Sequence, residues 1–234
     1  LQLLLGPLVI ALNGNADPQV EAVYQRALEI CEELNDEVSK VPLYFGLRSF
    51  YLATGDLNSE HEISTNLLNV AQQEQREDAL LEANVALSNS YFYMGNEALS
   101  YQHGTAASDL YDPEKHSGHA AIYGLDPGIN CYLRLAQTAC FQGRLNVARQ
   151  WEQKAKDAAD QTSHLISKVF ALENLAFSAH FVRDYAYSAE LNEEALQLSE
   201  EQRFPFYRAW ALMQHGNSLV HLGKASQGFT ELET

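Results

Sequence analysis

Apolar residues recur every three or four positions along most of this chain, in runs separated by small or polar dipeptides. Such steps place the apolar side chains on one face of an α-helix. The runs on either side of one dipeptide, Gly55-Asp56, carry apolar residues at Leu43, Leu47, Phe50, Tyr51, Leu57, Ile63, Leu67 and Val70. The pattern therefore predicts pairs of amphipathic helices that meet at each dipeptide.

The helix-breaking dipeptides are evenly spaced. They are Gly14-Asn15, Gly55-Asp56, Gly95-Asn96, Gly143-Arg144, Arg183-Asp184 and Gly223-Lys224. The intervals are near-equal, and only the one between Gly95 and Gly143 is distinctly longer. Glycine suits the end of a helix because it adopts the left-handed conformation without a Cβ penalty. Arg183 stands where the other breaks have glycine, so we expect it to be a less comfortable turn.

The recurrence predicts helical hairpins of about 40 residues each. The expected helices are 1–13, 17–35, 40–54, 58–75, 77–94, 97–111, 127–142, 145–161, 164–182, 185–202, 205–222 and 225–233. Prolines at 18, 42 and 205 fall near expected helix starts, where proline is tolerated. We predict an all-α fold, an α-solenoid of about six helical hairpins in a right-handed superhelix, which forms a single domain over residues 1–234.

The composition supports a helical fold. Alanine and leucine together outnumber isoleucine and valine by more than three to one, and β-branched residues favour strands. An all-β fold is therefore nearly excluded. The net charge of −16 repels phosphate, so nucleic acid and anionic membranes are not expected as partners. The chain has no apolar run long enough to span a bilayer, so we predict no membrane span.

Three cysteines, Cys31, Cys131 and Cys140, lie in apolar helical settings, as expected for reduced thiols in a cytoplasmic protein. A Cys131–Cys140 disulfide is not expected, because nine residues along one helix span about 13 Å. The chain starts without methionine or a signal-peptide pattern and stops inside an apparent helix. We therefore expect a fragment of a larger protein.

The long interval in the repeat places an inserted loop at residues 112–128, with two Asp-Pro steps and three glycines. Such loops are often functional. One hypothesis is structural: Asp112 and Asp126 cap helices, while Tyr111 and Tyr123 pack on neighbouring helices. A second is a metal site built from Asp112, Glu114, His116, His119 and Asp126. A third is a docking loop for a partner.

We expect Ile122 and Tyr123 to fold back onto the third and fourth hairpins, because both are too apolar to remain in water. His116 and His119 are then expected near the surface. The loop would cover one end of the groove, beside Asn130 and Gln137.

The hairpins resemble the tetratricopeptide repeat, with small residues at the turn and at the close crossing of the two helices. The matching residues are Tyr24, Ala27, Tyr91, Gly95, Ala107, Ala136, Gly143, Ala148, Ala155, Ala176, Ala195, Gly216 and Gly223. Glu60 departs from the pattern, and the period is longer than the family's usual one. The stretch from Tyr111 to Cys131 further resembles the helical-repeat region that follows the ATPase module in large bacterial signalling proteins of cyclase, kinase or transcriptional-regulator type. That resemblance implies a regulatory domain.

In stacked hairpins the first helix of each pair lines the groove. The residues expected to bind a partner there are Asn89, Phe92, Asn130, Leu133, Gln137, Glu173, Phe177, Trp210 and Met213, together with Tyr111, Asp112, His116, Tyr123 and Asp126 of the loop. Asparagine and glutamine can hydrogen-bond an extended peptide. The alternative is that they satisfy one another or bind water.

No catalytic motif is complete. Gly223-Lys224-Ala225-Ser226 lacks the earlier glycine of a phosphate loop, since position 218 is Ser218. His61-Glu62 begins a zinc-protease motif, but Thr65 stands where the second histidine is required. We therefore predict a non-enzymatic interaction domain without a cofactor or metal. It would bind a peptide, a partner protein or another domain of its parent chain. The alternative function is a small-molecule sensor, which would show a closed apolar pocket.

Overall fold

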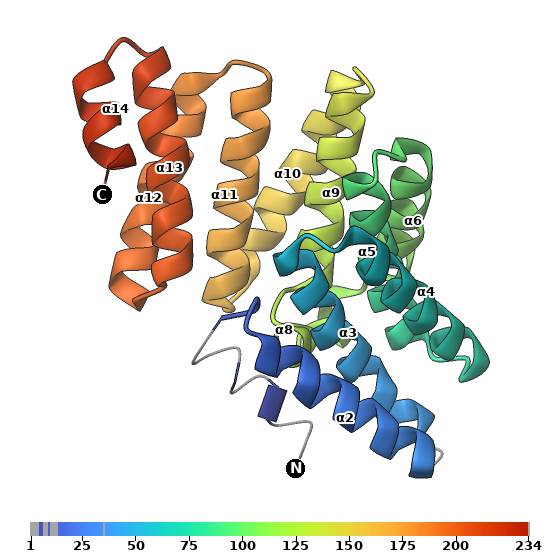
Figure 1. Cartoon of the computed structure of the whole chain (residues 1–234). Helices are drawn as coiled ribbons and strands as arrows, with labels where there is room; N and C mark the ends of the chain where they lie inside the picture. The colour runs from blue at the N-terminus through green and yellow to red at the C-terminus, as the bar shows by residue number, and fades with distance from the viewer. Residues whose placement is uncertain (1–4, 7–8, 10–13, 35, 234) are drawn as a thin grey trace.

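The computed structural model describes residues 5–6, 9, 14–34 and 36–233. This part of the chain is helical and contains no strand (Figure 1). The helices are α2 (Pro18–Leu34), α3 (Glu37–Thr54), α4 (Leu57–Gln73), α5 (Glu77–Tyr93), α6 (Glu97–Leu110), α7 (Pro113–His116), α8 (His119–Tyr123), α9 (Pro127–Phe141), α10 (Leu145–Gln161), α11 (Leu165–Phe181), α12 (Tyr185–Gln202), α13 (Pro205–His221) and α14 (Ala225–Leu232). None of the described helices is both long enough and apolar enough to cross a membrane.

The helices pair in sequence order, and the α-solenoid is confirmed. Five hairpins are described in full: α3 with α4, α5 with α6, α9 with α10, α11 with α12 and α13 with α14, while α2 packs on α3. The expected helix over residues 1–13 lies largely outside the described residues. None of the three cysteines forms a disulfide within the part of the chain that the structure describes.

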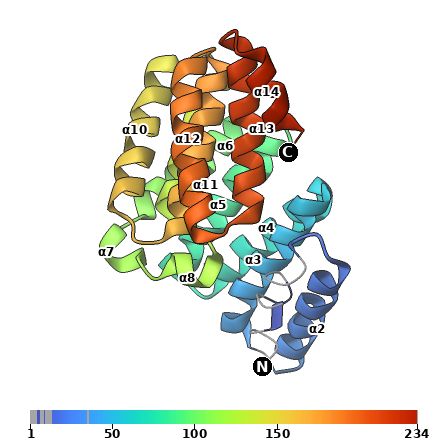
Figure 2. The ribbon, with the colours of Figure 1, turned by 90° about the vertical axis from the view of Figure 1, so that its left-hand side faces the viewer.

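The hairpins form two layers. The first helices α5, α9, α11 and α13 pack against one another in order, whereas each second helix packs on the first helix of the next hairpin (Figures 1 and 2). The more closely spaced layer is the inner side of a curved stack, and the first helices occupy it. We call its open surface the first-helix face.

Small residues allow the two helices of a hairpin to cross closely. Ser100 on α6 donates its hydroxyl to the Ser88 carbonyl on α5 at 2.8 Å, and the Ser88 hydroxyl donates to the Ser100 carbonyl at 2.9 Å. These reciprocal bonds join α5 and α6 at their crossing.

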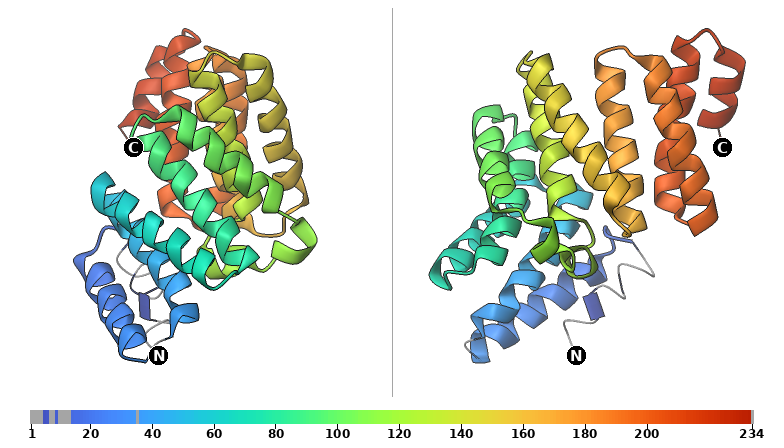
Figure 3. Two further views of the ribbon diagram at one scale, coloured as in Figure 1. Left: turned by 90° about the vertical axis from the view of Figure 1, so that its right-hand side faces the viewer. Right: turned by 180° about the vertical axis from the view of Figure 1, so that it is seen from behind.

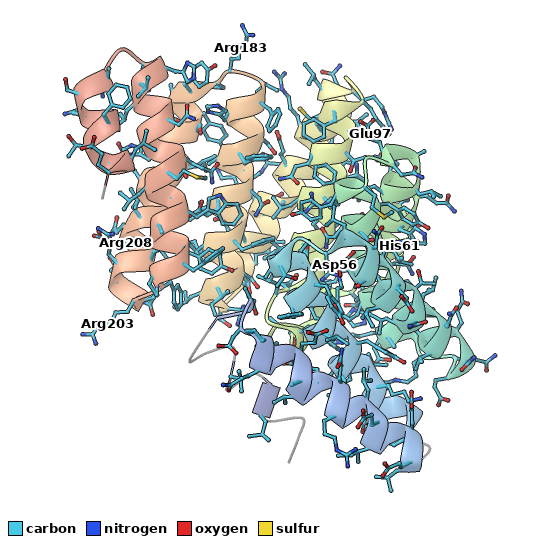
Figure 4. All side chains as sticks on the ribbon, in the orientation of Figure 1. Asp56, His61, Glu97, Arg183, Arg203 and Arg208 are labelled. Atoms are coloured by element: carbon cyan, nitrogen blue, oxygen red, sulfur yellow. The ribbon has the colours of Figure 1, made fainter. Side chains whose placement is uncertain are left out.

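Most hairpin turns use a left-handed residue, as the dipeptide pattern predicted. Gly55, Gly95, Gly143 and Gly223 have φ between 72° and 81°, and Arg183 takes the same conformation at φ 63°. A non-glycine residue in this region costs about 1–2 kcal/mol, so Arg183 is the strained turn that the sequence predicted. Figure 4 shows its side chain extending away from the tip of the α11–α12 hairpin.

One local prediction was wrong. Pro42 does not lie at a helix start, because α3 begins at Glu37 with Asp36 capping the Ser39 amide. The proline therefore lies in the second turn of the helix. The insertion 112–128, expected as an ordered or semi-ordered loop, contains the short helices α7 and α8.

Candidate functional site

The first-helix face is built from a repeated stripe. On α9 the positions 130, 134, 137 and 141 share one side of the helix, because steps of four and three follow the helical period. The same spacing relative to the turn recurs on α5 and α11, so equivalent residues of successive hairpins lie in rows across the stack. One such row contains Asn89, Gln137 and Phe177.

The row nearest the turn is an exposed line of rings. Tyr93, Phe141 and Phe181 are 46%, 41% and 49% exposed although each is a large aromatic residue. Phe141 stacks on Phe92 with ring centroids 5.4 Å apart, and it meets Phe181 edge-on at 4.9 Å. Phe181 in turn contacts Phe177 at 4.7 Å. We call these five residues the aromatic strip.

Buried amide side chains lie next to the strip and bond one another across three helices. Asn89 on α5 donates to Asn130 on α9 at 3.3 Å, and Gln137 on α9 donates to Asn174 on α11 at 3.1 Å. Arg134 joins the two pairs, since it donates to Asn89 at 2.6 Å and to Gln137 at 2.8 Å. We call these five residues the amide ladder. A satisfied buried network of this kind fixes the relative position of the helices that carry it.

Arg134 links the ladder to the strip. Its guanidinium carbon lies 4.0 Å from the ring centroid of Phe92 and 4.9 Å from that of Tyr93, and it donates to the Tyr93 hydroxyl at 3.3 Å. Among the described residues no carboxylate lies within ion-pair distance of it. Burial lowers the pKa of Arg134 from its usual value. Neutral oxygens and aromatic faces therefore take the place of a counter-ion.

A narrow crevice opens beside the strip. It is lined by Gln137, Cys140, Phe141, Phe177, Ser178 and Phe181, and it is too narrow to admit a water molecule. The crevice is a seam between rings, unlike the enclosed pockets of several hundred Å³ that hold small ligands.

The predicted groove residues divide into two groups. Phe92 and Phe177 belong to the aromatic strip, and Met213 is exposed, with Trp210 half-buried on the same helix. In contrast, Leu133 and Glu173 are buried between hairpins, and Asn89, Asn130 and Gln137 are buried in the amide ladder. The expectation that this second group lines an open groove was wrong, because the next first helix covers these positions. The amides satisfy one another, which was the alternative.

Glu173 is a buried carboxyl beside this network. It accepts a hydrogen bond at 2.8 Å from Gln214, and its second oxygen has no hydrogen-bond partner. Burial raises its pKa to about 8, and the Gln214 bond only partly opposes that rise. The carboxyl is therefore largely protonated at neutral pH. It holds α11 against α13 and is not presented to a partner.

In the insertion, both predicted caps are present. Asp112 accepts from the Glu114 amide at 3.0 Å, and Asp126 accepts from the Ile129 amide at 3.0 Å. Tyr111 packs against the Tyr132 ring at 6.0 Å and donates to Asp126 at 3.2 Å.

The expected positions of His116, His119 and Ile122 were wrong, and that of Tyr123 was only partly correct. His116 is 5% exposed and His119 is also shielded, because His119 contacts Glu82 and the two imidazoles contact each other. Ile122, expected to fold back with Tyr123, is 62% exposed. The Tyr123 ring contacts Phe45 of the second hairpin, and it packs against a core cluster that also contains Ala79, Ala83 and Ala86 of α5 in the third hairpin, so its expected position was correct in part.

The possible metal ligands of the insertion are engaged with other protein groups. His119 bonds Glu82 at 2.6 Å, His116 accepts from the Asp112 amide at 3.0 Å, and Asp126 caps α9. Within the described part of the chain, no group of three histidine, cysteine or acidic residues has a geometry that could hold a metal.

Tyr93, Phe141, Phe181 and Arg134 were not among the residues predicted from the sequence. The signal was present in the helical period. Phe181 lies four residues after Phe177, and Phe141 lies four after Gln137, so both continue the stripe that already contained predicted residues. Phe141 and Phe181 lie close to the turn, and aromatic residues at a helix end are often interpreted as core residues. For this reason they were not predicted to be exposed.

Antiparallel hairpins stacked in two layers define an α-helical repeat protein of the solenoid type. Two solved structures share this fold. The crystal structure of BtubC (BKLC) from P. vanneervenii aligns with a TM-score of 0.65 and 15% sequence identity, over 91% of this chain and 87% of that one. The crystal structure of the apo form of RapI aligns with a TM-score of 0.74 and 14% identity, over 99% of this chain and 79% of that one.

Identities this low establish the fold alone. No protein-family model matches the sequence, and the comparison with curated proteins found no match.

Proposed function

We propose that this chain is a non-catalytic interaction module that binds an extended peptide segment along the aromatic strip. The observation that carries the proposal is the exposure of three rings, Tyr93, Phe141 and Phe181, at the same position of three consecutive hairpins. Aromatic residues are enriched in the binding hot spots of protein interfaces. A row of rings that crosses α5, α9 and α11 offers successive contacts to a chain lying across the helices.

The rigidity of the strip supports binding. Arg134 packs against Phe92 and Tyr93 while bonding Asn89 and Gln137, so the rings are held in place before a ligand arrives. Preorganised side chains lose less entropy on binding than mobile ones. The amide ladder therefore acts as the support of the strip and does not itself read the peptide.

The bound segment is proposed to belong to a protein partner or to another domain of a parent signalling ATPase, where it would regulate an upstream effector. The resemblance of the Tyr111–Cys131 stretch to ATPase-associated repeat regions motivates this context. A small-molecule sensor is the less favoured function. The crevice beside Phe177 and Phe181 is too tight for a ligand, whereas the strip is open along its length.

The test is selection of a random peptide library displayed on phage against the chain, followed by affinity measurements on the selected peptides by fluorescence polarisation. We expect the double substitution Phe141→Ala/Phe181→Ala to weaken binding at least about tenfold, since aromatic hot spots contribute about 2 kcal/mol or more. Phe229→Ala, at an exposed ring on α14, is the matched control and should bind as the parent does. Failure to enrich any peptide, or unchanged affinity in the strip variant, would show the proposal to be wrong.

A further inference from the structure

The contact between first helices is interrupted at one place. The helices α5, α9, α11 and α13 pack on one another in order, but α3 makes little contact with α5 and packs on α8 of the insertion. Figures 1 and 3 show α2, α3 and α4 inclined away from the direction of the later hairpins. Figure 2 shows α8 beside α3. The insertion thus fills the space where two neighbouring first helices diverge.

Two side chains of α8, one helical turn apart, attach it to the other helices. The His119 Nδ1 atom lies 2.6 Å from the Glu82 carboxylate of α5. The Tyr123 ring meets the Phe45 ring of α3 edge-on, with centroids 5.1 Å apart, and it also packs against His119 at 5.4 Å. One polar and one aromatic group therefore hold the segment on two different hairpins.

The residues that receive these side chains lie in rows that a neighbouring first helix covers in the later hairpins. Glu82 stands at the same distance from its turn as Asn130 of the amide ladder, so both belong to one row of the stripe. Phe45 is equivalent in the same way to Leu133 of α9, at the edge of the stripe. The insertion therefore covers positions on α3 and α5 that a neighbouring first helix covers in the later hairpins.

Glu82 depends on α8 for its polar partner. It is 1% exposed, and burial raises its pKa while the hydrogen bond from His119 opposes the rise. The other charges that act on it are those of Arg48 on α3 and Asp126 at the start of α9, with opposite signs. A buried carboxyl without a hydrogen-bond partner is unfavourable. The site is thus suited to any segment that supplies an equivalent donor.

The attachment of α8 is local and short. The helix has five residues and lies between Gly118 and Gly124, and Gly124 adopts φ 85°. So short a helix has little stability of its own, and its order depends on contacts with its neighbours, which include the buried Ala120 and the His116 ring besides the two anchoring side chains. It is therefore a good candidate for local opening within a folded stack.

We propose that α8 is an intramolecular strap that occupies the space between α3 and α5 and detaches reversibly to admit a partner segment. The partner would present an imidazole or basic side chain and an aromatic ring four residues apart, as His119 and Tyr123 do. This inference goes beyond the proposed function, because the site is separate from the aromatic strip. The competing possibility, a permanent wedge, is an outcome of the tests below.

The first test is native-state hydrogen exchange on the parent chain. A detachable strap predicts that the amides of residues 119–124 exchange by local opening, at least about a hundredfold faster than the amides in the middle of α9. Exchange of both segments at the same rate, with the same denaturant dependence, would show that α8 opens only when the stack unfolds and would overturn the proposal.

The second test supplies the strap in trans. The probe is a synthetic peptide of residues 117–125, and the receiving chain is the His119→Ala/Tyr123→Ala variant, with helicity checked by circular dichroism. We expect the peptide to bind this variant at least tenfold more tightly than the parent, whose own strap competes. Ile122→Ala, at the exposed position of α8, should behave as the parent.

A peptide with alanine at both anchor positions is the matched control and should not bind. Equal binding of the native-sequence peptide to variant and parent, or no binding to a folded variant, would contradict the strap. Because Phe141→Ala/Phe181→Ala leaves the α3–α5 site intact, failure at the aromatic strip and failure here remain distinguishable.

Discussion

The guanidinium of Arg134 packs on the ring of Phe92 at 4.0 Å, and this contact joins the buried network of the stack to its exposed aromatic strip. The arginine bonds two amide oxygens on the buried side and approaches Phe92 and Tyr93 on the other. A single side chain therefore couples the alignment of α5 and α9 to the surface proposed to bind a partner.

Replacing Arg134 should destabilise the protein strongly. Arg134→Met keeps most of the side-chain volume but leaves the Asn89 and Gln137 oxygens without their donor. Each buried unsatisfied acceptor costs about 1–3 kcal/mol, so we expect a loss of about 2–4 kcal/mol in urea unfolding. Arg149→Met, at an exposed position, should change stability by less than about 0.5 kcal/mol. If Arg134→Met also changes stability by less than about 0.5 kcal/mol, the other residues of the amide ladder must rearrange to satisfy one another without the arginine.

The cap at Asp126 should matter more than an exposed cap. Asp126→Ala removes the bond to the Ile129 amide and the bond from the Tyr111 hydroxyl, and we expect it to cost about 2 kcal/mol. Asp184→Ala removes a cap bond to the Tyr187 amide at an exposed turn, and should cost about 1 kcal/mol. Chemical unfolding of both variants gives the comparison. Equal losses would show that the Tyr111 bond adds nothing.

Glu173 should make stability fall as pH rises. Its pKa is near 8 in the folded protein, above the ordinary value of 4.5. Between these values the folded state holds a proton that the unfolded state has lost. The contribution of Glu173 to the free energy of unfolding is therefore fully present below pH 4.5 and is lost as pH rises toward 8. The slope is at most about 1.4 kcal/mol per pH unit.

Urea unfolding of Glu173→Gln between pH 5 and pH 8 tests this assignment. The neutral amide should remove most of the pH dependence of stability. The stability of the variant relative to that of the parent should therefore increase as pH rises. Glu200→Gln, at an exposed carboxylate, is the control and should follow the parent curve. A Glu173→Gln curve parallel to that of the parent would mean that the carboxyl ionises normally.

The close crossing of α13 and α14 should not accept a side chain. A Cβ atom added at Gly216 would lie 2.8 Å from the Gly228 carbonyl oxygen, which is backbone and cannot turn aside. We expect Gly216→Ala to lower stability by about 1–3 kcal/mol through overpacking. At Gly118 the added atom would meet open space, so Gly118→Ala should be neutral or slightly stabilising. Thermal melting of the two variants checks this. Equal melting temperatures would show that the helices separate at little cost.

Much of the architecture follows from local sequence signals. The turn glycines, the capping aspartates and the three-and-four spacing of apolar residues predicted all but one of the main described helices to within two residues at each end. Asp126 followed by Pro127 marked the start of α9 correctly, since both the cap and the proline act within one turn of the helix. The exception is α3, where Pro42 suggested a later start than the one that Asp36 sets.

Exposure within the first helices could not be read from the sequence. Leu133, Glu173 and Met213 stand at the same position of three hairpins, ten residues before the turn, yet the first two are buried and Met213 is exposed. The period gives the face of the helix, but only packing against a neighbouring helix decides whether that face is covered. For this reason the predicted groove included residues that the stack encloses.

The aromatic strip and the strap were decided by tertiary structure for the same physical reason. Phe92 and Phe141 stack although they belong to different hairpins, and His119 meets Glu82 although an entire helix separates them in the sequence. The sequence by itself determined where helices start, end and turn, because caps and glycine conformations act over a few neighbouring residues. Which side chains meet between hairpins was set by how the helices stack. When one helix shifts relative to its neighbour, all the side-chain contacts between them change. The sequence near any one residue therefore does not indicate which residues it will contact in another hairpin.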